Sequence, residues 1–221
     1  MRAAAGVPPS LPQTVLGLPL VLASASPRRQ EILRLAGLPF EVCPSEAEPG
    51  PLPGSEPFEY CQWSAQDKAA AVAEGLPGRL VIGADTIVVL GRDILGKPED
   101  LAAARAMLRR LSGRQHAVYT GLAIMLGPTT SCLALGHERS LVTFRRLAEG
   151  EIERYVASGD PLDKAGAYGI QSQGGELVAE VMGSYLNVVG LPLGRLRTML
   201  AAVGWVMRET NENEATDRSA R

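Results

Sequence analysis

Two adjacent arginines, Arg28 and Arg29, lie where the sequence predicts the start of a helix. Ser26 is a favourable residue for capping the amino end of a helix, and Pro27 suits its first position. The free N–H groups and the macrodipole already make this end positive, so each cation there costs about 0.3–1 kcal/mol. Serine hydroxyls, backbone amides and guanidinium groups together favour binding of a phosphate or a carboxylate. We interpret residues 24–29 as an anion-binding site whose arginines can be replaced without destabilising the free protein; solvated surface arginines are the alternative.

A single carboxylate, Asp85, stands between two apolar runs, VIGA and TIVV. An unpaired carboxylate in a buried strand is costly, so the position favours a cationic partner or a metal ion. In the alternative interpretation, Gly83 interrupts the strand over residues 80–90 and Asp85 occupies a turn. Asp85 is therefore a candidate base or metal ligand.

Two lysines, Lys68 in a predicted helix and Lys97 before Pro98, add further cations. Each lysine alone fits a solvated side chain, but together with the arginines they would supply the several cations that a triphosphate requires. Residues 91–97 (GRDILGK) match the GxxxxGK spacing of a common phosphate-binding loop. Pro98, however, has neither the hydroxyl nor the N–H that this loop requires. A hairpin turn at residues 91–93 is the better interpretation.

A glycine-rich segment, DKAGAYGIQSQGG, covers residues 163–175. Glycines allow the backbone to approach a ligand closely. The side-chain amide of Gln171 both donates and accepts hydrogen bonds, which suits the edge of a nucleobase. In the alternative interpretation Gln171 only braces the loop.

The elements that must position these residues follow no strict strand–helix alternation. Strands are predicted at residues 20–23, 40–43, 80–90, 116–126, 132–144 and 176–182, and helices at 27–36, 58–75, 99–111, 149–157 and 193–203. In the first helix Ile32, Leu35 and Ala36 are expected to be buried, and Gly37 is expected to end the helix. The pattern predicts an α/β fold with a mixed sheet and helices packed around it.

Composition sets the broad class of the protein. The chain has 221 residues, of which 46% are hydrophobic and 21% charged, as in an ordinary globular protein. A formal net charge of −2 gives no long-range attraction to nucleic acid or to an anionic membrane. No stretch is long and apolar enough to span a bilayer. Three widely spaced cysteines and two distant histidines argue against a thiolate or imidazole metal site and favour reduced thiols in the cytoplasm.

Turn-forming residues and polarity mark the expected domain boundaries. Prolines and glycines interrupt the apolar stretch before Leu20, so residues 1–19 are expected to form a flexible N-terminal extension, not a cleaved leader. Residues 20–205 are expected to form the folded domain. Residues 206–221, which are mostly polar, are expected to form a disordered tail or a linker.

Five short motifs occur in a characteristic order along the chain. They are SASPRR at 24–29, GADT at 83–86, KP at 97–98, SG at 112–113 and DKAGAYGIQ at 163–171. In this order and spacing, over about residues 20–202, the chain resembles the Maf family of nucleoside triphosphate pyrophosphatases. AYGIQ is similar to the branch of that family that acts on dTTP and UTP, and not to the branch that acts on 7-methyl-GTP. The resemblance implies an inosine-triphosphatase-like α/β fold, with an elongated, twisted, mixed sheet, two lobes around a central cleft and often a homodimer.

The resemblance also implies roles for individual residues. Asp85 would be the catalytic acidic residue. The positions that would set base preference are Arg28, Thr86 and Gln171. The positions that would line the phosphate site are Ser24, Arg29, Lys68 and Lys97.

A divalent metal, Mg²⁺ or Mn²⁺, is the implied cofactor. Asp85 and an acidic residue after the second strand would hold it, and counting from Phe40 this acid is Glu48. Pro49 stands where the family often has a second acid, and Ser172 replaces a usual glycine. These departures concern the metal ligands and the loop, not the class of reaction.

The implied reaction is attack of water on the α-phosphorus, which releases pyrophosphate and a nucleoside monophosphate. Positioning and charge neutralisation by a metal and by cationic side chains are what such a reaction needs. The implied partner is a nucleoside triphosphate, with a possible homodimer and no nucleic acid or membrane. Two alternatives are a nucleotide-binding or regulatory module of a larger fusion protein, and a hydrolase that cleaves the γ-phosphate, which Pro98 disfavours.

Overall fold

The computed structural model describes residues 15, 17–50, 54–128 and 131–207. Most of the expected N-terminal extension and most of the expected tail lie outside the described residues. Val15 is buried in the core, and the indole N–H of Trp205 donates to the carbonyl of Leu18 at 2.9 Å, so packing begins before Leu20. Among the described residues, none of the helices combines the length and the apolarity needed to cross a bilayer.

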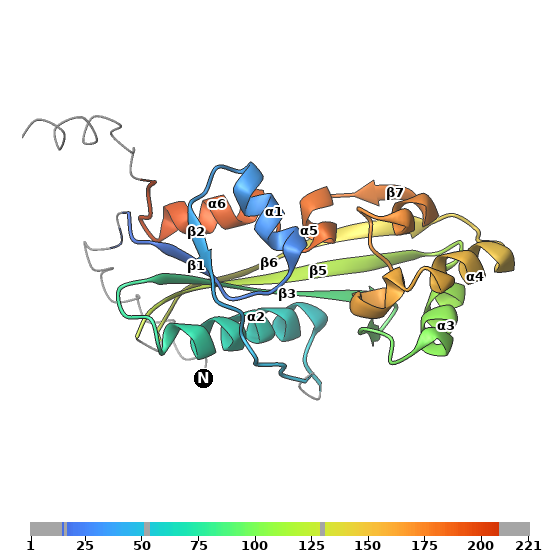
Figure 1. Cartoon of the computed structure of the whole chain (residues 1–221), viewed down its shortest axis with the longest axis horizontal. Helices are drawn as coiled ribbons and strands as arrows, with labels where there is room; N and C mark the ends of the chain where they lie inside the picture. Colours follow the sequence, from blue (N-terminus) through green and yellow to red (C-terminus); the bar gives the residue numbers. More distant parts are fainter. Residues whose placement is uncertain (1–14, 16, 51–53, 129–130, 208–221) are drawn as a thin grey trace, which may run out of the picture.

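Within the described residues, seven strands form one mixed sheet that runs along the long axis of the molecule (Figure 1). In spatial order they are β2 (Phe40–Val42), β1 (Leu20–Leu22), β3 (Leu80–Leu90), β5 (Gln115–Leu126), β6 (Cys132–Phe144) and β7 (Val178–Met182), with β4 (Asp93–Leu95) paired to β3. β1 pairs in parallel with β2 and β3, whereas the remaining pairs are antiparallel. β3 and β4 form the predicted hairpin, which confirms that residues 91–97 are not a phosphate loop. The mixed sheet confirms the expected fold class.

Helices cover both faces of the sheet and one of its ends (Figure 1). They are α1 (Pro27–Leu35), α2 (Pro57–Ala73), α3 (Leu101–Leu111), α4 (Glu149–Ala157), α5 (Tyr185–Val189) and α6 (Leu193–Ala202). α2 packs on one face against β3 and β5, and α1, α5 and α6 lie on the other face. α3 and α4 pack together at the far end, and short 3₁₀ turns follow α4. α5 lies between the predicted strand at 176–182 and the predicted helix at 193–203, where the sequence analysis predicts no helix.

β3 is one continuous strand, so the alternative interpretation with a turn at Gly83 is wrong. Every residue from 80 to 89 pairs with β5, and Asp85 lies opposite Gly121. The glycines are needed for close packing instead. A Cβ atom on Gly83 would lie 2.0 Å from the carbonyl oxygen of Ala65 in α2, and one on Gly121 would lie 2.1 Å from that of Cys61. The two glycines therefore let α2 approach the sheet beside Asp85.

α1 buries a different stripe from the one that the sequence predicts. Ile32 and Leu33 are buried, whereas Leu35 is 82% exposed, so the predicted burial of Leu35 is wrong. Arg29, Ile32 and Leu33 are three and four positions apart and share the face that turns toward the sheet. Gly37, with φ of +69°, ends the helix as predicted. The buried face of α1 thus carries Arg29 inward.

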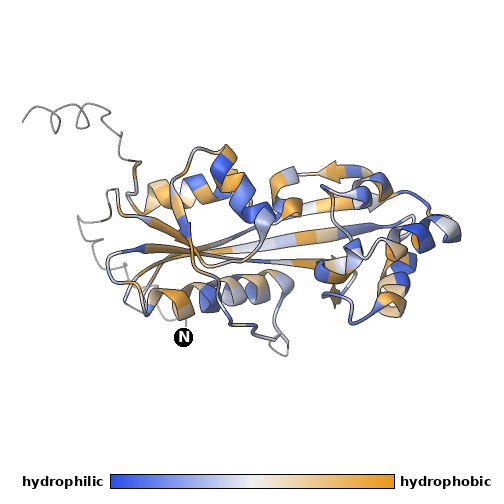
Figure 2. Cartoon of the chain, in the orientation of Figure 1, coloured by the Kyte–Doolittle hydropathy of each residue, from blue (hydrophilic) through white to orange (hydrophobic). Residues whose placement is uncertain are grey.

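Apolar residues concentrate along the strands and on the inner sides of the helices (Figure 2). One apolar cluster, which includes Leu22 and Ile82, lies under α1 and α6. A second cluster, which includes Val88 and Phe144, lies under α3 and α4. The middle of β3, which is the most polar part of this strand, lies between these two clusters. Each cluster forms the core of one lobe.

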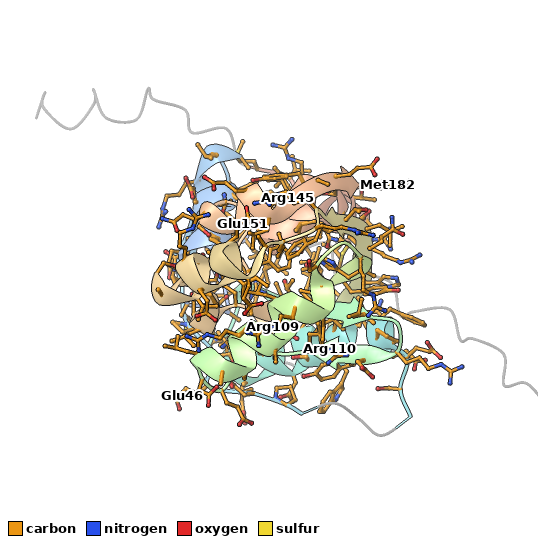
Figure 3. The ribbon with its side chains drawn as sticks, turned by 90° about the vertical axis from the view of Figure 1, so that its right-hand side faces the viewer. Glu46, Arg109, Arg110, Arg145, Glu151 and Met182 are labelled. Carbon is orange, nitrogen blue, oxygen red and sulfur yellow. The ribbon has the colours of Figure 1, made fainter. Side chains whose placement is uncertain are left out.

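Ion pairs join the surface elements at the end that α3 and α4 form. Arg145 and Glu151 lie side by side there (Figure 3), with 2.8 Å between their charged atoms. The Arg145 guanidinium also donates to the carbonyl of Glu176 at 2.7 Å. The hydrogen bond from Arg145 lowers the pKa of Glu151 to about 2. These contacts hold α4 against the segment that leads into β7.

Candidate active site

The middle of β3 has one open edge. β1 pairs with residues 80–82 of β3 and β4 pairs with residues 88–90, so no described strand pairs with residues 83–87 on this side. Asp85 and Thr86 lie in this gap and point to opposite faces, because side chains alternate along a strand. Asp85 faces α2, whereas Thr86 faces α1.

The gap opens into a cleft of about 720 Å³. The structure brings all of the sequence-predicted site residues to its walls: Ser24, Arg28, Arg29, Glu48, Lys68, Asp85, Thr86, Lys97 and Gln171. Their individual roles stay predictions. A cavity of similar volume, about 740 Å³, lies along β5 and β6 and contains none of these residues.

Asp85 forms an ion pair with Lys68 of α2. The Lys68 ammonium donates to Oδ1 of Asp85 at 2.5 Å, and the two side chains are only 15–20% exposed. A partner of opposite charge offsets the cost of placing a carboxylate in this mostly apolar strand. The predicted cationic partner of Asp85 is thus confirmed. This partner, Lys68, belongs to α2 and precedes Asp85 by 17 positions in the sequence.

Arg29 is held by the protein itself. Its guanidinium donates to the carbonyl of Gly190 at 2.9 Å, to Oγ of Ser24 at 2.9 Å and to Oγ1 of Thr86 at 3.1 Å. Burial lowers the pKa of Arg29, and the nearby charge of Asp85 opposes this shift. These contacts reverse the expectation for Arg29: we now expect that its removal destabilises the free protein, because three segments lose a shared donor.

Thr86 belongs to a directional chain of hydroxyl groups. Its Oγ1 lies 3.0 Å from Oγ1 of Thr120, which in turn lies 3.0 Å from the carbonyl oxygen of Asn187. A carbonyl only accepts, so Thr120 donates to Asn187 and Thr86 donates to Thr120. The sequence analysis missed Thr120 and Asn187, because only the β3–β5 register shows that Thr86 and Thr120 are opposite each other.

Arg28 points toward the glycine-rich loop. Its guanidinium lies 3.7 Å from the carboxylate of Asp163, and its side chain is 32% exposed. An exposed pair at this distance contributes little to stability. Arg28, unlike Arg29, is thus placed to meet an incoming anion.

The two arginines are expected to respond differently to replacement by alanine. Arg28→Ala should weaken binding of a non-hydrolysable triphosphate roughly tenfold and leave unfolding unchanged. Arg29→Ala should weaken binding and also lower the free energy of unfolding by about 1–3 kcal/mol, because buried acceptors lose their donor. Calorimetric titration and denaturant unfolding measure the two quantities. Equal unfolding midpoints for both variants would contradict the structural role of Arg29.

Glu48 forms a long ion pair with Lys97, the lysine of the KP motif. Its carboxylate is 3.9 Å from the Lys97 ammonium, and both side chains are mostly exposed. The hydroxyl of Tyr60 donates to the carbonyl of Pro49 at 3.1 Å and so ties the segment that carries Glu48 to α2. Burial, together with the charges of Asp85 and Glu48, raises the pKa of Tyr60.

Two acidic side chains of the cleft, Glu48 and Asp85, are the candidate ligands of a divalent metal. In the described part of the chain, no group of three or more His, Cys, Asp or Glu side chains is arranged to hold a metal ion. Mg²⁺, however, commonly uses one or two carboxylates and takes its remaining ligands from water and substrate phosphates. Glu48 and Asp85 line the same cleft and are the carboxylates that such a metal would use together with a triphosphate.

The protein therefore has an α/β fold and a cleft in which several cationic side chains lie near the paired carboxylate of Asp85. Such a cleft suits a polyphosphate. The comparisons with known proteins agree with this class. The Maf-like protein family matches residues 19–203, and the chain belongs to this family.

Named relatives cover most of the chain. The dTTP/UTP pyrophosphatase of Moorella thermoacetica is 51% identical over 185 residues, which are 84% of this chain and 95% of that protein. The dTTP/UTP pyrophosphatase of Symbiobacterium thermophilum is 47% identical over 84% of this chain and 94% of that protein. Among solved structures, a HAM1 protein from Coxiella burnetii matches 83% of this chain and 98% of that chain, with 18% identity and a TM-score of 0.48.

Proposed function

We propose that this protein hydrolyses dTTP and UTP to the nucleoside monophosphate and pyrophosphate. The observation that carries the proposal is the Asp85–Lys68 pair on the open edge of β3, which lines the same cleft as Arg28, Arg29 and Lys97. The names of the Moorella and Symbiobacterium relatives, both dTTP/UTP pyrophosphatases, support the choice of substrate.

The reaction is attack of a water molecule on the α-phosphorus. Asp85 takes a proton from this water as the new oxygen–phosphorus bond forms, and the bond to the β-phosphate oxygen breaks. Lys68 holds the Asp85 carboxylate in place. Arg28 and Lys97, which are more exposed, bind the charged phosphates and stabilise the leaving pyrophosphate.

We propose Mg²⁺ or Mn²⁺ as the cofactor, held by Glu48 and Asp85. When bound, such a metal neutralises phosphate charge and acts as a Lewis acid. The roles of Asp85 as proton acceptor and as metal ligand are both compatible with its place in the cleft.

Product analysis tests the proposed function. The protein is incubated with a panel of ribo- and deoxyribonucleoside triphosphates and either Mg²⁺ or Mn²⁺, and the products are resolved by chromatography. Pyrophosphate with a monophosphate from dTTP and UTP is the expected result. Orthophosphate with a diphosphate would indicate cleavage at the γ-phosphate, and binding without turnover would indicate the nucleotide-binding module.

Gln171 is expected to select uracil and thymine. Its amide can pair with the N3–H and a carbonyl of these bases, whereas cytosine presents an amino group and an unprotonated nitrogen. Mispaired polar groups in a closed site cost about 1–2 kcal/mol, so Gln171→Ala should lower the ratio of kcat/KM for UTP over CTP roughly tenfold. If kcat/KM falls equally for the two substrates, Gln171 only braces its loop.

We also propose a homodimer in the cytoplasm, as the family likeness implies. Analytical ultracentrifugation tests the oligomeric state. A sedimenting mass equal to that of one chain at micromolar concentration would contradict the dimer.

A further inference from the structure

Lys164 lines the cleft, but its ammonium group is bound by acceptors of the protein itself. Its ammonium donates to the backbone carbonyl of Asp160 at 2.6 Å and to Oδ1 of the same residue at 2.9 Å. It also donates to Oδ1 of Asp163 at 2.6 Å. The Lys164 side chain is only 9% exposed. A lysine with these partners is poorly placed to bind a phosphate, and it holds the two ends of a short turn together.

The second oxygen of Asp160 extends these contacts to the far side of the loop. Oδ2 of Asp160 accepts from the hydroxyl of Tyr155 at 2.7 Å and from the hydroxyl of Ser172 at 2.6 Å. The Tyr155 hydroxyl itself accepts from the backbone N–H of Gly169 at 3.1 Å. We call Tyr155, Asp160, Lys164 and Ser172 the loop brace. Partial burial alone would raise the pKa of Asp160, but these hydrogen bonds outweigh it and lower the pKa.

The backbone inside the loop brace is tightly packed. Ala167 has φ of +60°, which is unfavourable for a residue with a side chain, so its surroundings must hold it there. The N–H of Gly166 donates to the carbonyl of Gly96 at 3.0 Å. A Cβ atom on Gly169 would lie 2.5 Å from Cε of Lys164. The loop is therefore wrapped around the Lys164 side chain.

Gln171 lies between two anchored positions of this loop. Gly169 is held through Tyr155, and Ser172 is held through Asp160. Ser172 also closes a turn over Gln171, because its N–H donates to the carbonyl of Gly169 at 3.2 Å. The backbone that carries Gln171 is thereby restrained before any nucleotide binds, while its side chain is exposed.

We propose that the loop brace positions Gln171 and so sets the selectivity of the cleft for uracil over cytosine. The proposal rests on the proposed function, and it makes Lys164 and Ser172 positioning residues. Lys164 also holds Asp163, which lies beside Arg28, so one lysine links two of the positions expected to set base preference.

The test uses Ser172→Ala, which removes one hydroxyl from the exposed side of the loop brace, with Ser172→Thr as the conservative variant. Ser158→Ala is the matched control, because the Ser158 hydroxyl contacts the backbone of Tyr155 and Asp160 but not the carboxylate. The ratio of kcat/KM for UTP over CTP is measured for each variant. Hydrogen–deuterium exchange at residues 169–172 is followed in the free protein.

Ser172→Ala is expected to lower the UTP-over-CTP ratio about fivefold, as loss of one hydrogen bond allows, with kcat for UTP nearly unchanged. Exchange of the Ser172 N–H should become faster. Ser172→Thr and Ser158→Ala should keep the wild-type ratio. A folded Lys164→Met variant should lower the UTP-over-CTP ratio further. If Lys164→Met does not fold, the result for Ser172→Ala alone tests the role of the loop brace.

An unchanged ratio in Ser172→Ala with faster exchange would overturn the proposal, as would an equal loss for UTP and CTP. A wild-type protein that releases no pyrophosphate from UTP would refute the proposed function instead. In that case the ratio of dissociation constants for UTP and CTP, measured by calorimetry, replaces kcat/KM and is interpreted in the same way.

Discussion

Replacing Asp85 with asparagine is expected to lower kcat for UTP about a hundredfold or more, while the protein stays folded. The amide keeps the volume of the side chain but has no negative charge, so it cannot accept a proton from water or hold a metal well. Lys68 loses its charged partner, but this lysine is 20% exposed and can be hydrated. Turnover is measured by pyrophosphate release, and folding by circular dichroism and the thermal midpoint.

Asp67→Asn provides a control for Asp85→Asn, because Asp67 is the neighbour of Lys68, the ion-pair partner of Asp85. Asp67 precedes Lys68 on α2 and does not line the cleft, so Asp67→Asn should keep wild-type turnover. Binding of Mn²⁺ in the presence of a non-hydrolysable triphosphate separates the two roles of Asp85: weaker binding in Asp85→Asn indicates a metal ligand, and unchanged binding a proton acceptor. A folded Asp85→Asn protein with activity within about twofold of the wild type would exclude both roles.

The second large effect is a loss of stability between pH 6.5 and pH 4, caused by His116. This histidine is 2% exposed, and its Nε2 lies 2.8 Å from the hydroxyl of Tyr168. Its Nδ1 has no hydrogen-bond partner among the described residues, so a protonated ring would carry an unpaired buried N–H. Burial lowers the pKa of His116 to about 4.

The sign of this effect follows from the two states. Between the folded pKa of about 4 and the unfolded value of 6.5, the unfolded chain binds a proton that the folded protein does not. The contribution of neutral His116 to the free energy of unfolding is therefore complete above pH 6.5, falls as the pH drops, and is lost at about pH 4. A difference of this size corresponds to about 3 kcal/mol in the free energy of unfolding.

Denaturant unfolding at a series of pH values measures the slope of the free energy of unfolding against pH. His116→Gln should flatten it between pH 6.5 and 4, whereas His137→Gln, which removes the other histidine of the chain, should keep most of it because His137 is less buried. The absolute stability of His116→Gln is not the test, because a buried amide has its own cost. An NMR titration of wild-type His116 with a midpoint near 6.5 would contradict the prediction.

Local chemistry made several features predictable from the sequence. Gly37 ends α1 and residues 91–93 form a hairpin turn, because backbone conformations of this kind depend on a few adjacent residues. The need of Asp85 for a partner was predictable in the same way, since the cost of a carboxylate among apolar residues does not depend on the rest of the fold.

Long-range packing decided what local patterns do not contain. The sequence left the cationic partner of Asp85 unspecified, and the close approach of α2 over Gly83 and Gly121 placed Lys68 beside it. The orientation of α1 turned Arg29 toward Gly190 and Thr86. Register placed Thr120 opposite Thr86, although 34 positions separate them.

The sequence by itself determined which charged side chains are available, because the types and order of the cations and of Asp85 already predict an anion site. The division of labour among those side chains was decided by the tertiary structure. Arg29 and Lys164 are bound by the protein's own acceptors, whereas Arg28 and Lys97 remain more exposed in the cleft. The physical reason is that a cation's availability depends on which acceptors lie within about 3 Å of it, and strand register and helix packing set those distances.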